Sequence, residues 1–346
     1  MAVTHDYLST LFYGPGNAIL ESGVRVSGKT TIERGTWVRL DSSLHNAALA
    51  EDVFVGFRSD LSNCIVGQGT LIASGACIGQ PESEACQIGR GVWIGAGATI
   101  RPDVALGDGA VVAAGSVVSS DIPANHIVAG SPASLRAVRQ AIDDGLPNFR
   151  ELLKSVIERQ RKAQLLMPAL VRALGDNSAT ASVMKTLLIG EVPSASSWDV
   201  GAIALLDADL SGGYGVRLED GVVLIGRGRL THGLWAKGGI SLGDRSVVGE
   251  GSILEGAGGI DIGVEARVGA RVHILSSSHN YSRTSLPLSA APVFIGADTC
   301  IGPDSLLVGP LNIPKGHTIP ARSVVIPDHA DRQQYKIFKI VEEVTE

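Results

Sequence analysis

The stretch "IGRGVWIGAGATIRPDVALGDGAVVAAGSVV", residues 88–118, repeats an aliphatic residue at every sixth position. The six are Ile88, Ile94, Ile100, Leu106, Val112 and Val118. A period of six fits neither the 3.6-residue turn of an α-helix nor the two-residue alternation of a half-buried strand. It fits a triangular coil of parallel strands, in which each side supplies one inward aliphatic residue. The stretch therefore predicts a parallel β-helix.

A second array has the same period further along the chain. It comprises Leu242, Val248 and Leu254, then Ile262, Val268 and Ile274, and finally Ile295, Ile301, Leu307, Ile313, Ile319 and Val325. The 43 glycines exceed the ~7% average usage, as expected where many tight corners need unusual backbone angles. Two antiparallel sandwiches would require strict alternation and turn dipeptides, which are mostly absent. We therefore expect two β-helices in a mainly β chain.

Between the arrays, the composition changes. Glycine is nearly absent from residues 139–190, where Phe149, Leu152, Leu153 and Val156 recur at helical spacing. This predicts a first β-helix domain over residues 1–138, an α-helical connector over 139–190, and a second β-helix domain with a short C-terminal tail over 191–346.

Charge and composition exclude several partners. The net charge is −6 with no basic run, which argues against nucleic acid and anionic membranes. No apolar run approaches the ~20 residues of a membrane span, and the opening "MAVTHDYLST" lacks the layout of a signal peptide. The four cysteines show no metal-ligand spacing and read as reduced thiols. We expect a cytoplasmic protein without a bound metal.

One large interruption breaks the second array. Ile274 and Ile295 are 21 positions apart instead of six, so fifteen extra residues intrude after His279. A solenoid wall is flat and offers no pocket. A protruding loop and a neighbouring subunit could enclose a site there, with His279 near a corner of the coil.

The residues of both arrays resemble the hexapeptide-repeat, left-handed β-helix acyltransferases, and among them the sugar O-acetyltransferases of the maltose and colanic-acid type. In the second array, "SSSHNYSRTSLPL", "PVFIGADTCIGPDSLLVGPLNI" and "IPARSVV" carry the resemblance. In the first array, "GVWIGAGATIRPDVALGDGAVVAAGSVVSSDIPANHIVAGSPASLR" does so. The resemblance implies left-handed coils, assembly as a homotrimer or a multiple of three, and acetyl-CoA as co-substrate.

His279 is the candidate general base. A neutral imidazole could take the proton of an acceptor hydroxyl as its oxygen attacks the thioester, and backbone N–H groups could stabilise the oxyanion. An ordinary solvent-facing histidine is the alternative. Counting by hexads places Asn312 one coil after His279, and Gly259 or Asp261 one coil before it. Asp261 could fix the imidazole tautomer there, or be a solvated turn aspartate.

By resemblance, CoA is expected in a cleft between neighbouring subunits, near the final coils of the second array. The residues expected there are Gly302, Ala321 and Arg322. Lys315 and Arg322 could meet a CoA phosphate, or be solvated charges. The expected acceptor contacts are in the interrupting loop, at Asn280, Tyr281, Ser282 and Arg283.

The first array presents the opposite combination. Ser83 stands where the second array has His279, so a base is missing. Yet this array keeps residues that contact CoA in similar enzymes, and the AGSPA stretch at 129–133. These are Trp93, Gly95, Ala96, Ala114, Gly115 and Ser119. The second array has Cys300, Pro303 and Ile326 at such places. Either the first array is an inactive structural copy, the interpretation that we favour from the sequence, or one site combines both arrays.

The function expected from the sequence is transfer of an acetyl group from acetyl-CoA to a hydroxyl of a sugar or sugar-containing acceptor. Three alternatives remain. One is N-acylation of an amino sugar, and another is a non-catalytic β-helical scaffold. The third is a zinc enzyme of the β-helical carbonic-anhydrase type, using His232, His273 and His279. His45 could serve the first array as a base or simply occupy a turn.

Overall fold

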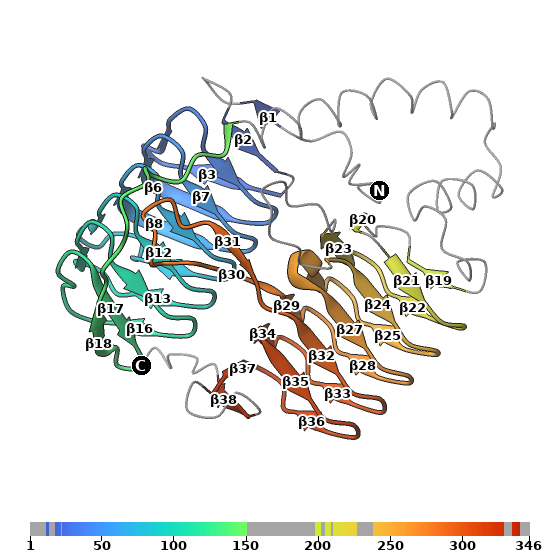
Figure 1. The fold of residues 1–346 in the computed structure, drawn as a ribbon. Helices are drawn as coiled ribbons and strands as arrows, with labels where there is room; N and C mark the ends of the chain where they lie inside the picture. Colours follow the sequence, from blue (N-terminus) through green and yellow to red (C-terminus); the bar gives the residue numbers. More distant parts are fainter. Residues whose placement is uncertain are drawn as a thin grey trace, which may run out of the picture. The chain divides into compact units, whose positions relative to one another are not determined.

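The computed structural model describes residues 12–13, 18–21, 23–150, 198–201, 205–208, 210–226, 238–328 and 334–339. The chain divides into two compact units, each a stack of short parallel strands (Figure 1). The first unit is Met1–Ala169 together with His279–Pro287, and the second is Leu170–Ser278 together with Leu288–Glu346. The prediction of left-handed β-helices in a mainly β chain is confirmed.

In the first unit, one nine-stranded sheet forms a side of the coil. Its strands, in spatial order, are β1 (Phe12–Tyr13), β2 (Ile19–Leu20), β5 (Trp37–Val38), β7 (Phe54–Val55), β9 (Leu71–Ile72), β12 (Trp93–Ile94), β15 (Val111–Val112), β17 (His126–Ala129) and β18 (Ser134–Val138). β17 and β18 pair antiparallel, so a hairpin closes this end of the sheet.

The remaining strands of the first unit belong to a second nine-stranded sheet that bends around a corner. They are β3 (Arg25–Ser27), β4 (Thr31–Ile32), β6 (Ser43–Leu49), β8 (Asp60–Val66), β10 (Cys77–Ile78), β11 (Cys86–Ile88), β13 (Thr99–Ile100), β14 (Ala105–Leu106) and β16 (Val117–Val118). β8 pairs with β10 through Asp60 and Leu61, and with β11 through Cys64 to Val66. Asn63, at φ 46°, stands at the bend between the two pairings.

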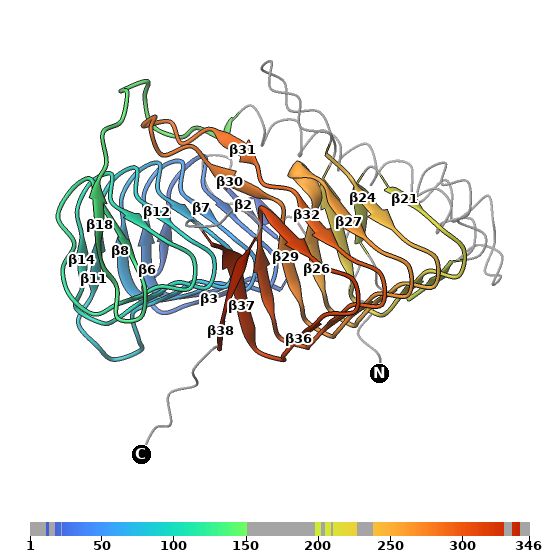
Figure 2. The same cartoon turned by 60° about the horizontal axis from the view of Figure 1, so that its bottom comes forward.

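The second unit has three sheets, whose strands stack along the unit in Figure 2. One contains β19 (Asp199–Val200), β22 (Arg217–Leu218), β25 (Val247–Val248), β28 (Arg267–Val268), β33 (Cys300–Ile301) and β36 (Thr318–Ile319). Another contains β20 (Leu205–Ala208), β23 (Val223–Gly226), β26 (Ile253–Glu255), β29 (His273–Leu275), β34 (Leu306–Val308), β37 (Ser323–Pro327) and β38 (Tyr335–Lys339). The third contains β21 (Leu210–Gly212), β24 (Ile240–Leu242), β27 (Ile260–Ile262), β32 (Val293–Ile295) and β35 (Leu311–Ile313).

Two short additions complete the described elements. A 3₁₀ turn, η3 (Gly256–Gly258), follows β26, and a two-stranded sheet joins β30 (Ser277–His279) to β31 (Leu288–Ala290). None of the described helical residues forms a segment long and apolar enough to cross a membrane.

The six-residue period is the register of the stack. Ile94 pairs with Ile72 in the coil before it and with Val112 in the coil after it. All six aliphatic residues that recur in residues 88–118 are buried, and Ile94 is 0% exposed. Burying each such side chain contributes roughly 1.5–3 kcal/mol, so the repeated aliphatic column supplies the core of the unit.

The helical connector needs correction where it can be seen. Residues 139–149 are extended rather than helical, and residues 151–190 lie outside the described part of the chain. Pro147 disfavours the helical conformation at the residue before it, and Gly145 adopts φ 92°. Residues 139–150, called the strap below, instead run along the corners of the first unit's coils.

The middle and far end of the strap are fixed by apolar contacts and ion pairs. A Cβ placed on Gly69 or Gly91 would lie 2.9 Å from the side chain of Leu146, so these left-handed corners give it room. The ring of Phe149 packs on Phe54 with centroids 5.6 Å apart. Arg150 forms ion pairs with Asp52 and Glu51.

Candidate active site

The loop that interrupts the second array lies on the first unit. Residues His279–Pro287, called the His279 loop below, belong to the compact unit that contains β12. The His279 ring meets the Trp93 indole edge-on, with centroids 5.7 Å apart and planes at 68°. The Tyr281 ring stacks on the same indole at 5.9 Å and 29°. Trp93 therefore holds both rings of the loop by aromatic contacts.

A backbone carbonyl orients the imidazole. Nδ1 of His279 lies 2.7 Å from the carbonyl oxygen of Leu286. A carbonyl only accepts hydrogen bonds, so Nδ1 carries a proton, and in the neutral ring the lone pair is on Nε2. Nε2 is therefore the atom that could accept a proton from a substrate.

Leu286 accounts for the shape of the loop. Its φ of 46° is uncommon for a residue with a branched side chain and costs of order 1 kcal/mol. The side chain is only 2% exposed, and its burial contributes roughly 1.5–3 kcal/mol. Burial can thus offset the backbone strain and keep the Leu286 carbonyl beside His279.

The strap pairs with the backbone of the His279 loop. Ile142 N–H donates to the Ser282 carbonyl at 2.9 Å, and Thr284 N–H donates to the Ile142 carbonyl at 3.0 Å. Ile142 and Arg283 consequently form an isolated parallel β-bridge.

Arg139, at the start of the strap, is buried, with 5% exposure. Its Nε donates to the Tyr281 carbonyl at 2.6 Å, and Nη2 donates to the Arg283 carbonyl at 2.7 Å. Nη1 donates to the Gly109 carbonyl at 2.9 Å and to the Gly91 carbonyl at 3.4 Å. Burial lowers the pKa of Arg139, but a guanidinium starts so high that it stays charged at neutral pH.

Asp144 binds the far half of the loop. Its carboxylate accepts from Ser285 N–H at 2.9 Å, from Ser285 Oγ at 2.8 Å and from Arg283 Nε at 2.7 Å. The hydrogen bonds from Ser285 and then those from Arg283 hold the pKa of Asp144 well below its usual range. The carboxylate is therefore ionised wherever the chain is folded at ordinary pH.

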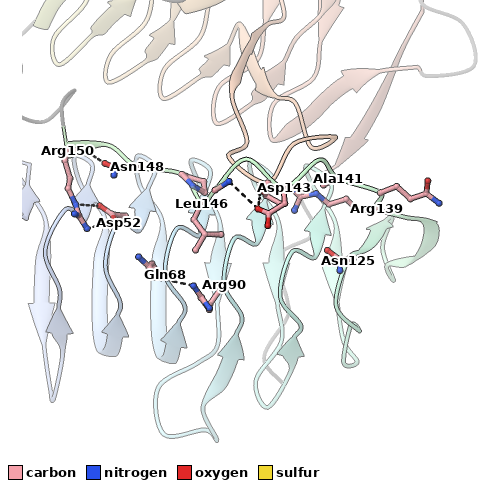
Figure 3. A pocket seen from close by; sticks show the side chains of 14 residues that line it. Asp52, Gln68, Arg90, Asn125, Arg139, Ala141, Asp143, Leu146, Asn148 and Arg150 are labelled. Carbon is pink, nitrogen blue, oxygen red and sulfur yellow. Dashed lines mark hydrogen bonds and ion pairs between the residues drawn. The ribbon is translucent and has the colours of Figure 1, made fainter.

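A polar groove of about 900 Å³ lies between the strap and the coil corners, bordered at Thr284 by the His279 loop (Figure 3). The side chain of Leu146 points from the strap toward the coils, and Arg90 and Gln68 project from the corners. Arg139 and Arg150 line opposite ends of the groove.

Small residues next to Trp93 let the backbones of two adjacent coils approach closely, an arrangement called a close step below. A Cβ on Gly95 would lie 2.4 Å from the backbone nitrogen of Ala114, which is one coil further on, so the position requires glycine. Gly115 N–H donates to the Ala96 carbonyl at 2.8 Å. These four small residues of the expected CoA motif therefore lie on two adjacent coils, in the turns that follow Trp93 and Val112.

Comparison with known proteins identifies the repeat. Residues 85–120 match the family model described as bacterial transferase hexapeptide (six repeats). This segment carries bacterial transferase hexapeptide repeats. The match covers Trp93, Gly95 and Ala114, and it confirms the resemblance to the hexapeptide-repeat transferases.

Relatives of the hexapeptide chain include acetyltransferases of two kinds. The galactoside O-acetyltransferase of Escherichia coli (strain K12) is 43% identical over 65 residues, 19% of this chain and 31% of that protein. The 2,3,4,5-tetrahydropyridine-2,6-dicarboxylate N-acetyltransferase of Clostridium perfringens (strain SM101 / Type A) is 39% identical over 88 residues, 25% of this chain and 35% of that protein. The chain thus spans about a third of the length of these relatives.

A partial match among solved structures is the acetyltransferase domain of PglB from Neisseria gonorrhoeae FA1090 in complex with acetyl coenzyme A. It is 24% identical, with a TM-score of 0.27, and the match covers 34% of this chain and 57% of that one.

The stacking expected for Asp261 and Asn312 is wrong. Phe294 pairs with Asp261 on one side and with Asn312 on the other, all three facing outward in the second unit. His279 belongs to the first unit, where the Leu286 carbonyl orients its ring. The loop removes His279 from the hexapeptide count, and Phe294 occupies the coil position between the two residues.

The residues expected to bind CoA in the second array lie on the second unit. A Cβ on Gly302 would lie 2.3 Å from the nitrogen of Ala321, so this pair repeats the close step seen at Gly95 and Ala114. Lys315 is paired with Asp298 at 3.3 Å, and its side chain is 75% exposed. Arg322 is exposed, with φ 57°.

The expected acceptor contacts hold the loop together. Asn280 Oδ1 accepts hydrogen bonds from the backbone and hydroxyl of Ser282 and so closes a turn. Arg283 is paired with Asp144, and Tyr281 is 44% exposed on top of Trp93. Tyr281 thus offers an exposed aromatic surface in a position fixed by the Trp93 ring.

The other histidines lie in structural surroundings. Nδ1 of His45 lies 2.9 Å from Ser27 Oγ, and Nε2 lies 3.1 Å from Asn46 Nδ2, at a corner of the coil. Nε2 of His273 lies 2.7 Å from Glu255, whereas His232 lies outside the described residues. Among the residues that the structure describes, no three His, Cys, Asp or Glu side chains gather as a metal site.

Ser83 does not take the place of a base. Its hydroxyl donates to the Gln80 carbonyl at 2.7 Å within the turn that follows β10. Sequence reasoning missed Arg139 and Asp144, because both fall in the segment expected to be a helical connector. The six-residue period ends before them, so it carried no signal for either.

Proposed function

We propose that the chain transfers an acetyl group from acetyl-CoA to a hydroxyl of a sugar or sugar-containing acceptor, at a single site built from the His279 loop and the Trp93 surface. The contact between His279 and Trp93 carries the proposal, because it puts the candidate base beside the better CoA motif. Of the two interpretations left open by the sequence, we adopt the one in which a single site combines features of both arrays.

The chemistry follows from the orientation of the imidazole. Nε2 of His279 takes the proton of the acceptor hydroxyl as the oxygen attacks the thioester carbonyl, which forms a tetrahedral intermediate. The intermediate collapses, the C–S bond breaks, and the departing thiolate takes the proton back from the imidazolium. The Leu286 carbonyl, 2.7 Å from Nδ1, stabilises that imidazolium while it exists. Such proton transfer typically contributes about 10²- to 10⁴-fold.

CoA is assigned to the surface next to the base. Gly95 and Ala114 place no bulky side chain on the coil wall after Trp93, so an extended thioester arm could lie along it. The resemblance supports this assignment, since similar enzymes contact CoA at these positions. The step of Gly302 and Ala321 is the competing location for the same co-substrate.

Transfer to an amine is the second candidate. The chain is similar both to a galactoside O-acetyltransferase and to an N-acetyltransferase. A neutral imidazole could serve either reaction, because an amine also loses a proton when it is acylated. We favour the hydroxyl because the O-acetyltransferase match has the higher identity. We include assembly as a trimer or a multiple of three in the proposal, on the strength of the resemblance.

The test is incubation of the purified protein and acetyl-CoA with a panel of sugars, amino sugars and nucleotide sugars, followed by mass spectrometry of the products. An ester product that is cleaved by hydroxylamine supports O-transfer, and a resistant amide supports N-transfer. Absence of both products across the panel, together with no binding of acetyl-CoA, would favour the scaffold interpretation.

A further inference from the structure

We propose that Arg139 is a positioning residue that fixes the His279 loop in its working conformation, with Asp144 as its second anchor. The inference rests on the proposed function, because it assigns Arg139 a role in the reaction through His279.

The partners of Arg139 argue for this role. A buried guanidinium is costly unless its donors are satisfied, and among the described residues its partners are four backbone carbonyls rather than a carboxylate. Two of the carbonyls belong to corners of the first unit, at Gly91 and Gly109, and two belong to the loop, at Tyr281 and Arg283. One planar, rigid side chain therefore ties the loop to the coil that holds Trp93.

The tied carbonyls bracket the residues that set the imidazole. His279 is oriented by the Leu286 carbonyl and by Trp93, on which Tyr281 also stacks. Arg139 holds the backbone between His279 and Leu286, and Asp144 holds Ser285, next to Leu286. The main chain on both sides of the turn is thus fixed by strap side chains.

Loss of Arg139 would free this backbone without touching Nε2 or the step of Gly95 and Ala114. A misplacement of about 1 Å in a catalytic group can cost on the order of 10²-fold in rate. We expect Arg139→Gln to lower kcat by roughly 10- to 100-fold and to change KM for acetyl-CoA less than about twofold. Arg139→Lys, which keeps the charge but not the fork of donors, should recover part of kcat.

The matched control is Arg150→Gln. Arg150 holds the other end of the same strap through Asp52 and Glu51 and does not contact the loop. The kcat of Arg150→Gln should stay within about twofold of the wild type, because Arg150 does not hold the backbone of the His279 loop. If the strap had only a structural role, loss of either end would lower kcat alike.

The decisive experiment is a double-mutant cycle measured by thiol release. If Arg139 acts through His279, Arg139→Gln should reduce kcat in the wild type but add almost nothing in the His279→Ala background. Equal losses in both backgrounds, or a lost affinity for acetyl-CoA by calorimetry, would overturn the positioning role. Should Arg139→Gln fail to fold, the cycle is run with Arg139→Lys. If His279→Ala itself keeps full turnover, the proposed function fails. If His279→Ala loses turnover but Arg139→Gln keeps full turnover, only the positioning role of Arg139 fails.

Discussion

The His279 imidazole and the Trp93 indole meet edge to face, with centroids 5.7 Å apart, although His279 belongs to the loop that interrupts the second array and Trp93 lies in β12 of the first. The base candidate and the stronger CoA motif therefore lie in the same compact unit. The first array has Ser83 where the second has His279. The His279 loop, which comes much later in the chain, supplies the first unit with a histidine. Neither array needs to be a complete enzyme for this arrangement to work.

Replacing Trp93 should weaken the loop contacts and the binding of acetyl-CoA together. Trp93→Ala removes the stack with Tyr281 and the edge contact with His279, each worth about 0.5–1.5 kcal/mol. We expect a lower melting temperature and a higher dissociation constant for acetyl-CoA, both measured by calorimetry. Trp93→Phe is the control and should retain most of both; an unchanged affinity in Trp93→Ala would move CoA away from this surface.

The core column makes a stability prediction. Ile94 is 0% exposed, so Ile94→Ala should destabilise the first unit by about 2–5 kcal/mol. Ile65→Ala, at a position 49% exposed, should change stability by less than about 0.5 kcal/mol. Urea unfolding followed by hydrogen exchange of the β12 amides measures both, and similar losses in the two variants would contradict the inward column.

How far the sequence predicts the fold can be seen at Ile94. A coil of three six-residue sides forces residues eighteen apart into register, and Ile94 indeed pairs with Val112. The six-residue period no longer predicts which residues pair once extra residues are inserted, because it carries no information about the path of a long insertion. Counting forward and backward from His279 assigns Asn312 and Asp261 to the neighbouring coils, but both residues pair with Phe294 instead.

The candidate base and the CoA motif can both be identified in the sequence, but the contact between His279 and Trp93 cannot. His279 and Trp93 were singled out separately by an interruption and by a resemblance. Arg139 holds the loop through the backbone carbonyls of Tyr281 and Arg283, and Asp144 holds it through the backbone and hydroxyl of Ser285 and the guanidinium of Arg283. These partners lie far apart in the sequence and belong to no repeat, so no spacing in the sequence could reveal them.

The anchor at Asp144 predicts a pH dependence. Its pKa is lowered in the folded chain from a usual value near 3.8, so its contribution is complete above that value and is lost as pH falls through the folded pKa. Between pH 5 and 7, the loop amides of Asp144→Asn should exchange hydrogen faster than those of the wild type. The difference should begin to shrink below about pH 4, where the carboxylate of the opened loop binds a proton, and it should vanish as pH falls through the folded pKa. A constant difference down to pH 2, after correction for intrinsic exchange, would contradict the assignment.

Thiol reactivity should divide the cysteines into two pairs. Burial raises the pKa of Cys64 to about 12, and burial also raises the pKa of Cys86, whereas Cys77 and Cys300 are exposed. The thiolate is the reactive form, so iodoacetamide near pH 8 should label the exposed pair first. Peptide mass spectrometry of the native protein gives the order, and early labelling of Cys64 would contradict the packing between β8 and β11.

Thiol release by His279→Ala, measured with acetyl-CoA and a working acceptor, decides whether His279 is the base. We expect kcat to fall by at least about 10²-fold with little change in acetyl-CoA affinity, because the base acts on the acceptor proton. His45→Ala, whose ring nitrogens face Ser27 and Asn46, should keep near-normal turnover. Near-normal turnover in His279→Ala, together with its loss in His45→Ala, would contradict the site.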